Sequence, residues 1–355
     1  MQKVISFPHM GNYHVPVEVL LKLLFKNHKV EAAPKITKKT LELGSKYSPD
    51  FVCVPFKYNL GNYIEALDKG ANVLIQAGGG CRFGYYAEIQ EQILRDMGYK
   101  FEFIKLFGDN INPINLYKNS KKIGTDISFG KFLYIFVLII KMVNILDTIE
   151  AYIRENIGFE VIENSFENLQ KKFLNELKTV KNLKALKTVY KKYDKSFKEL
   201  PINKPDNCLK VGLVGELYTL MEPFSNYFIE KELAKNKIQV SRFITVTFLL
   251  FQKSLIRKKI LNGAGKYLKY EIGADGTDSV EKSKMLAEKG YDGIIHLKPF
   301  GCMPEVNAMP ILQNIGKDYK IPILYFSFDS QTSETGVKTR LEAFYDMLLM
   351  RKEIS

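Results

Sequence analysis

The chain has 355 residues, a length that predicts two domains. Its composition, 46% hydrophobic and 12% aromatic, excludes a disordered protein. Its formal net charge of +13 comes from lysines spread over many predicted helices. Without an Arg-rich cluster or a nucleic-acid motif, that charge does not predict nucleic acid as a partner. The four cysteines are too few for a disulfide framework and favour a reducing cytoplasm. The first residues resemble a strand and lack the apolar core of a signal peptide.

The first third of the chain alternates strand and helix patterns. Strands are predicted at 3–7, 30–33, 51–55, 73–76 and 101–106, and helices at 17–25, 37–43, 60–67 and 85–97. Continuous apolar strands separated by helices of this length predict a mostly parallel sheet with right-handed crossovers.

The middle of the chain, 126–200, shows no strand pattern and is predicted to form long helices. Its apolar run at 132–140 is bracketed by Lys131 and Lys141. Because a membrane span needs about 20 apolar residues, we expect a buried helix and no membrane contact. The lysines around 171–198 fall mostly off the apolar stripe, which is typical of a solvated helix face; a docking surface is the alternative.

A second α/β pattern follows a linker marked by Pro201 and Pro205. Strands are predicted at 210–214, 239–243, 293–297 and 322–328, and helices at 224–235, 279–289, 306–315 and 337–351. The sequence therefore predicts an α/β protein with two Rossmann-like lobes, mostly parallel sheets and a helical insertion between them. We expect an N-terminal lobe at 1–125, a helical segment and linker at 126–205, and a C-terminal lobe at 206–355.

Three of the four cysteines, Cys53, Cys81 and Cys302, lie where predicted strands end. Ligands of open α/β sheets bind beyond the carboxyl ends of the strands. The three thiols therefore suggest one shared metal centre, for which iron–sulfur fits best and would leave one iron open for chemistry. The alternative for each is a small buried hydrophobe. That interpretation suits Cys208, which precedes a strand and has no glycine turn beside it.

Glycines lie next to two of these cysteines. Gly79 and Gly80 precede Cys81 in a triple-glycine turn, and Gly301 precedes Cys302. Glycine lets backbone N–H groups approach a bound group closely, and Arg82 would add positive charge beside an anionic centre. A phosphate-binding loop is the alternative, but neither common nucleotide motif is present.

Three further side chains are candidates for proton transfer. His9 and His14 share the loop after the first predicted strand, where a structural role is the alternative. Glu216 occupies the equivalent loop of the second lobe. A helix cap explains Glu216 about as well as acid–base chemistry or substrate positioning.

Six segments together resemble the 2-hydroxyglutaryl-CoA dehydratase D-component family, the iron–sulfur 2-hydroxyacyl-CoA dehydratases and their relatives. They are 7–13 (FPHMGNY), 51–62 (FVCVPFKYNLGN), 76–86 (QAGGGCRFGYY), 214–226 (VGELYTLMEPFSN), 299–304 (PFGCMP) and 334–344 (ETGVKTRLEAF). The resemblance covers almost the whole chain and is greatest to the activase-associated branch of the family.

The resemblance implies a 4Fe–4S cluster held by Cys53, Cys81 and Cys302. It also implies radical dehydration of a 2-hydroxyacyl-CoA thioester to an enoyl-CoA through a ketyl. The electron would come from a separate ATP-dependent iron–sulfur activase, and family members work as dimers of this fold, with a second copy or a homologous subunit.

We therefore expect a cytoplasmic lyase, or a component of one, in anaerobic metabolism. Glu216, His9 and His14 would handle protons, and Arg82 would give electrostatic support. The alternative is a non-catalytic iron–sulfur subunit of an activase system, used for low-potential electron transfer or small-molecule reduction. A third possibility is a binding module without a cofactor.

Overall fold

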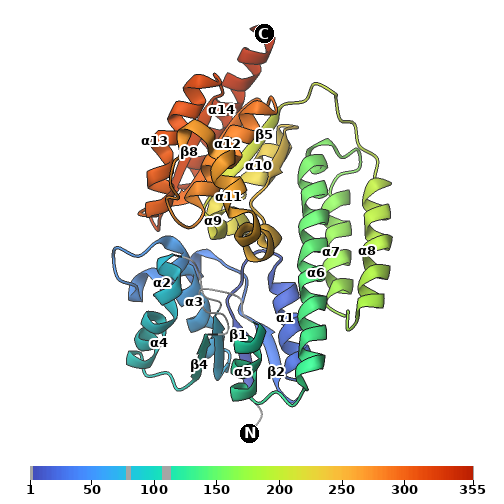
Figure 1. Ribbon diagram of the computed structural model, residues 1–355, viewed down its shortest axis with the longest axis vertical. Helices are drawn as coiled ribbons and strands as arrows, with labels where there is room; N and C mark the ends of the chain where they lie inside the picture. The colour runs from blue at the N-terminus through green and yellow to red at the C-terminus, as the bar shows by residue number, and fades with distance from the viewer. Residues whose placement is uncertain (1–2, 77–80, 106–112, 355) are drawn as a thin grey trace. The chain divides into compact units, whose positions relative to one another are not determined.

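The computed structural model describes residues 3–76, 81–105 and 113–354 (Figure 1). The chain divides into two compact units: Met1–Leu146 with Gln170–Asp194, and Asp147–Leu169 with Lys195–Ser355. We call them the first and the second unit. The division falls inside three helices: α6 (Phe129–Asn156), α7 (Ser165–Leu177) and α8 (Leu183–Lys198).

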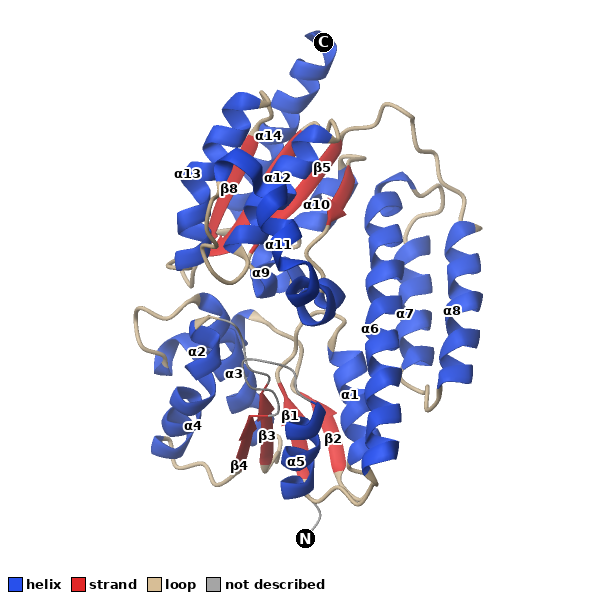
Figure 2. Ribbon diagram, viewed as in Figure 1, coloured by secondary structure: helices blue, strands red, loops and turns tan. Residues whose placement is uncertain are grey.

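The first unit contains a four-stranded parallel sheet in the order β2-β1-β3-β4 (Figure 2). Its strands are β1 (Val4–Phe7), β2 (Lys29–Ala32), β3 (Val73–Gln76) and β4 (Glu102–Lys105). Its other helices are α1 (His14–Leu24), α2 (Lys38–Tyr47), α3 (Val54–Asp68), the 3-10 helix η1 (Arg82–Tyr85), α4 (Tyr86–Asp96) and α5 (Pro113–Ile123).

The second unit repeats this arrangement, with a parallel sheet in the order β6-β5-β7-β8. Its strands are β5 (Lys210–Gly215), β6 (Gln239–Arg242), β7 (Gly293–Pro299) and β8 (Ile323–Phe328). Its helices include α9 (Leu217–Met221), α10 (Ile229–Lys235), α11 (Lys253–Ala264), α12 (Gly276–Glu288), α13 (Met303–Asp318) and α14 (Glu334–Ile354). Short helical turns are η2 (Ile157–Phe159), η3 (Pro223–Asn226), η4 (Phe248–Gln252) and η5 (Gly265–Tyr267).

The predicted fold class, two Rossmann-like α/β units with parallel sheets, is confirmed. In each sheet the chain first adds a strand on one side of the unit's first strand and then adds the next two on the other side. This change of side falls between β1 and β3 in the first unit and between β5 and β7 in the second. In open α/β sheets this switch point is where ligands bind, beyond the carboxyl ends of the strands.

Two predicted elements are wrong. The strand expected at 51–55 is absent; Cys53 is the extended N-cap residue of α3, and Pro55 lies in the first turn of that helix, a position that suits proline. The single helix expected at 224–235 is broken into η3 and α10. Tyr227 and Phe228 between them adopt left-handed conformations, with φ of 57° and 58°.

Helix α6 is the one helix in the described part of the chain long and apolar enough to cross a membrane. Of the 18 consecutive residues that make up its most apolar stretch, 50% are buried inside the protein. A core helix passes the same test of length and composition, so this property is weak evidence for a membrane span.

Helices α2 and α3 pack with their backbones in close contact, and two glycines make this possible. A Cβ added to Gly61 would lie 1.9 Å from the carbonyl oxygen of Thr40, and one added to Gly44 would lie 1.7 Å from that of Lys57. Thr40 also donates a hydrogen bond of 2.7 Å to Glu65. This contact determines the position of α3, and therefore of Cys53 at its start.

We predict that Gly61→Ala lowers the free energy of unfolding by at least about 1–3 kcal/mol, because the new methyl group must push two helices apart. The control is Gly130→Ala in α6, where an added Cβ has nothing within 4 Å. That change is expected to be neutral or stabilising by up to about 1 kcal/mol. Chemical denaturation measures both; equal stability of the two variants would contradict the packing argument.

Candidate functional site

Cys53 lies at the amino end of α3 in the first unit. It adopts φ −68° and ψ 154°, and its side chain makes no capping hydrogen bond to the helix. The half-buried sulfur lies 2.7 Å from the hydroxyl oxygen of Tyr86, the first residue of α4. The thiol therefore projects beyond the helix start toward the beginning of α4.

Hydrogen bonds from three directions hold α3 in place. Asn62 accepts from the backbone N–H of His9 at 2.7 Å and donates to the carbonyl of Pro34 at 2.8 Å. Tyr63 donates to the carbonyl of Ile75 in β3 at 3.2 Å, and Gln90 of α4 donates to the carbonyl of Phe56 at 3.1 Å. These bonds connect the helix that begins after Cys53 to the loop after β1, to β3 and to α4.

Cys81 directly precedes η1 and is exposed. Its carbonyl accepts a hydrogen bond of 3.0 Å from the backbone N–H of Gly84, which closes the first turn. Burial raises the pKa of Tyr86, and the nearby Cys53 and Cys81 raise it further. Tyr86 therefore contacts one predicted ligand cysteine, Cys53, and is influenced electrostatically by a second, Cys81. The predicted site residues Gly79 and Gly80 and the side chain of Arg82 lie outside the described residues.

Cys302 precedes a helix as Cys53 does, but it follows the third strand of its unit, β7, as Cys81 follows β3 in the first unit. It is the half-buried N-cap residue of α13, again with proline at the second helical position, Pro304. The backbone N–H of Cys302 donates to the carbonyl of Pro299 at 3.2 Å, closing a turn in which Gly301 has φ 75°. Only glycine adopts that conformation readily, so Gly301 is explained by the turn as well as by its predicted contact with a cofactor.

A buried polar cluster fixes the start of α13. His296 of β7 and Glu305 share a hydrogen bond of 2.6 Å between Nε2 and Oε2, and both side chains are fully buried. Ser279 of α12 donates to the other carboxylate oxygen of Glu305 at 3.1 Å. Glu305 therefore joins the first turn of α13, next to Cys302, to a central strand and to a neighbouring helix.

Lys298 is a buried cation near this cysteine that sequence analysis missed. It is 5% exposed and donates to the hydroxyl of Ser327 at 2.8 Å. Burial lowers the pKa of Lys298, while Cys302 and Glu305 act in the opposite direction. The sequence signal was a lysine in a strand that is apolar apart from His296, because a charge is rarely buried there without a partner.

The three cysteines have a common local environment that fits an iron–sulfur cluster. Each directly precedes a helix, where backbone N–H groups and the helix dipole favour a thiolate over a thiol. Cys53 and Cys81 belong to the first unit and Cys302 to the second. Within the described residues no three His, Cys, Asp or Glu side chains are grouped as a metal site requires, so shared ligation stays a prediction.

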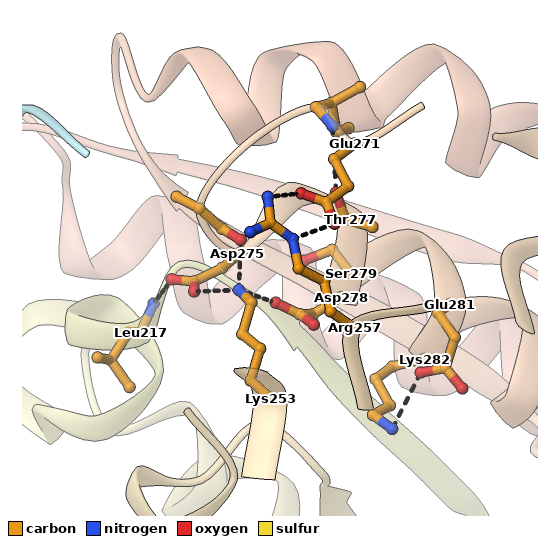
Figure 3. A network of polar contacts seen from close by, with 12 residues as sticks. Leu217, Lys253, Arg257, Glu271, Asp275, Thr277, Asp278, Ser279, Glu281 and Lys282 are labelled. Carbon is orange, nitrogen blue, oxygen red and sulfur yellow. Dashed lines mark hydrogen bonds and ion pairs between the residues drawn. The ribbon is translucent and has the colours of Figure 1, made fainter. Parts of the chain in front are cut away.

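Glu216 follows β5 and caps α9. Its carboxylate accepts hydrogen bonds from the backbone N–H groups of Tyr218 and Thr219 at 3.0 and 2.9 Å, and from the Thr219 hydroxyl at 2.8 Å. The adjacent Leu217 N–H donates to Asp275 at 3.1 Å (Figure 3). The capping role considered from the sequence is therefore present.

Lys253 of α11 lies between two further carboxylates, Asp275 and Asp278 (Figure 3). Its ammonium lies 3.6 Å from Asp275 and pairs closely with the fully buried Asp278. Loss of hydration raises the pKa of Glu216 to about 7, with a smaller contribution from Asp275. Burial likewise raises the pKa of Asp278 to about 6, although Lys253 opposes this change. The region therefore contains carboxyl groups that can exchange protons near neutral pH.

His9 and His14 are stacked after β1, with ring centroids 4.4 Å apart. The Nδ1–H of His14 donates to the carbonyl of Gly11 at 2.7 Å. Burial lowers the pKa of His14 to about 4, and His9 contributes in the same direction. His14 is therefore neutral at pH 7, and it fits a hydrogen-bonding role better than storage of a proton. A role of either histidine in proton transfer stays a prediction.

A family model described as 2-hydroxyglutaryl-CoA dehydratase, D-component matches residues 275–348. This stretch includes Asp275, Lys298, Gly301, Cys302 and Glu305. The family resemblance predicted from the sequence is confirmed there. A search of curated proteins finds no match to the chain.

We predict that the stability of the wild-type protein decreases relative to that of Glu216→Gln as the pH rises from 4.5 to 7. The pKa of Glu216 is raised from 4.5 to about 7. The folded state therefore binds a proton in this window that the unfolded state releases, and that stabilisation is lost as the pH approaches 7. At about 1.4 kcal/mol per pKa unit, the relative change is at most about 3 kcal/mol.

Urea unfolding of both proteins between about pH 3 and pH 8 measures this difference. Well below pH 4.5 the difference is expected to be constant, because the carboxyl group is then protonated in both states. Parallel stability curves across the whole range would show that Glu216 has an ordinary pKa.

Proposed function

We propose that the protein is an iron–sulfur component of the 2-hydroxyacyl-CoA dehydratase type, acting in the cytoplasm in anaerobic metabolism. The observation that carries the proposal is the family match, which includes Cys302 at the start of α13. The contact between Cys53 and Tyr86, and the electrostatic effect of Cys81 on Tyr86, support it independently, because these residues lie outside the matched stretch.

In this proposal Cys53, Cys81 and Cys302 hold a 4Fe–4S cluster. When bound, the cluster supplies one-electron transfer and an open iron that polarises a thioester carbonyl. The helix starts behind the cysteines favour the thiolates needed for binding. The backbone at Gly79, Gly80 and Gly301 and the charge of Arg82 would support the bound anionic group.

The protein's own residues would then move the protons of the dehydration. Glu216 is the best candidate, because a carboxyl group with a pKa of about 7 both accepts and releases a proton near neutral pH. His14, neutral at this pH, would orient a hydroxyl group by accepting its hydrogen bond at Nε2, with the stacked His9 supporting its ring.

The same proposal requires partners. A cluster of low potential needs an electron donor, and the expected one is an ATP-dependent iron–sulfur activase. A second copy of this chain or a homologous subunit would complete the enzyme. The exposed lysines of α7 and α8 and the surroundings of the cysteines are the two candidate docking surfaces for the donor.

The test of the dehydratase function is EPR of the anaerobically reduced protein with a panel of 2-hydroxyacyl-CoA esters. We expect at least one ester to change the cluster signal, because its carbonyl oxygen would reach the open iron. The matching acyl-CoA without the 2-hydroxyl group is the control and is expected to have a weaker effect. A strong cluster signal that no ester changes would contradict the dehydratase function and favour the alternative, a non-catalytic electron carrier.

A further inference from the structure

Tyr86 is held rigidly at the start of α4. Its side chain is buried, and its ring packs edge-on against Phe56 of α3, with centroids 4.8 Å apart and an angle of 87° between the rings. Phe56 is fully buried in the core of the first unit. This packing fixes the direction in which the hydroxyl group points, and that direction leads to the sulfur of Cys53 at 2.7 Å.

Ring packing alone does not explain the hydroxyl group. A phenylalanine would fill the same space against Phe56, whereas a buried hydroxyl needs a hydrogen-bond partner. A neutral thiol is a weak acceptor, but a thiolate is a charged one, and hydrogen bonds to charged acceptors are the stronger class. In the metal-free protein either the thiol or the hydroxyl can be the donor of this contact, and the backbone of Cys53 also hydrogen-bonds the hydroxyl. Once the sulfur has lost its proton, only the hydroxyl can donate to it.

A second observation supports a role at the metal site. Cys81, which lies in a different loop, also acts electrostatically on Tyr86. The hydroxyl thus contacts one of the three cysteines proposed as ligands and is influenced electrostatically by a second, and both belong to the first unit together with Tyr86.

We propose that the Tyr86 hydroxyl donates a hydrogen bond to the Cys53 sulfur in the iron-loaded protein and raises the reduction potential of the centre. This inference rests on the proposed function. A metal-bound thiolate has no proton to give, so Tyr86 is the donor. One electron added to the centre increases the negative charge on its ligand sulfurs, and a donated hydrogen bond stabilises that charge. Tyr86 is therefore a positioning and tuning residue rather than a ligand.

The test compares Tyr86→Phe with the wild type after anaerobic reconstitution, with the midpoint potential read by redox titration followed by EPR. We expect a more negative potential with unchanged iron content, because the ring that packs on Phe56 is kept. The control is Tyr117→Phe, which removes the hydroxyl of a tyrosine of α5 in the same unit, one that donates to the carbonyl of Ile127 at 3.0 Å. Its potential is expected to equal that of the wild type.

A second measurement needs no variant. Resonance Raman spectra of the wild-type protein in H₂O and D₂O are expected to show a shift of an iron–cysteine stretching band, because the donated proton exchanges. An unchanged potential in Tyr86→Phe, loss of iron from the folded variant, or no shift in D₂O would each overturn the inference. A wild-type protein that takes up no iron would overturn the proposed function as well, which distinguishes the two failures.

Discussion

The start of a helix is the structural constraint on which the candidate site depends. Cys53, Cys81 and Cys302 each lie immediately before a helix, so the position of every proposed ligand is set by where that helix begins. A helix start offers unpaired N–H groups and the positive end of the dipole, which stabilise a thiolate. A shift of any of these helices along its axis would move the sulfur and reduce its ability to bind metal.

The two units fix their helix starts by different means. In the first unit α3 is held by backbone contact with α2 at Gly61 and by the hydrogen bonds of Asn62. In the second unit α13 is held by Glu305, which is fully buried between His296 and Ser279. Burying a polar group is costly unless it is hydrogen-bonded, and both carboxyl oxygens of Glu305 have a partner. His296, Glu305 and Ser279 are therefore best understood as parts that position Cys302.

The sequence predicted the fold class and, among its nine strands, all eight that the described residues form, because apolar runs between helical patterns are typical of a buried parallel sheet. It failed at Cys53 because the short apolar run from 51 to 55 fits a strand as well as a helix start, and only the tertiary contacts of α3 decide between them. It also missed Tyr86 and Lys298. Their importance comes from neighbours distant in sequence, Cys53 and Ser327, which no local pattern reveals.

The central claim is that three cysteines from both units hold one iron–sulfur centre, and iron content is its most direct test. Each of Cys53, Cys81 and Cys302 is changed to Ser, with Cys208→Ser as the control, since Cys208 is buried and its sulfur lies near Gln239. After anaerobic reconstitution, the account predicts that each of the three variants folds but loses the cluster absorption and EPR signal, whereas Cys208→Ser keeps the wild-type iron content. Wild-type iron content in any of the three variants, or its loss only in Cys208→Ser, would contradict the account.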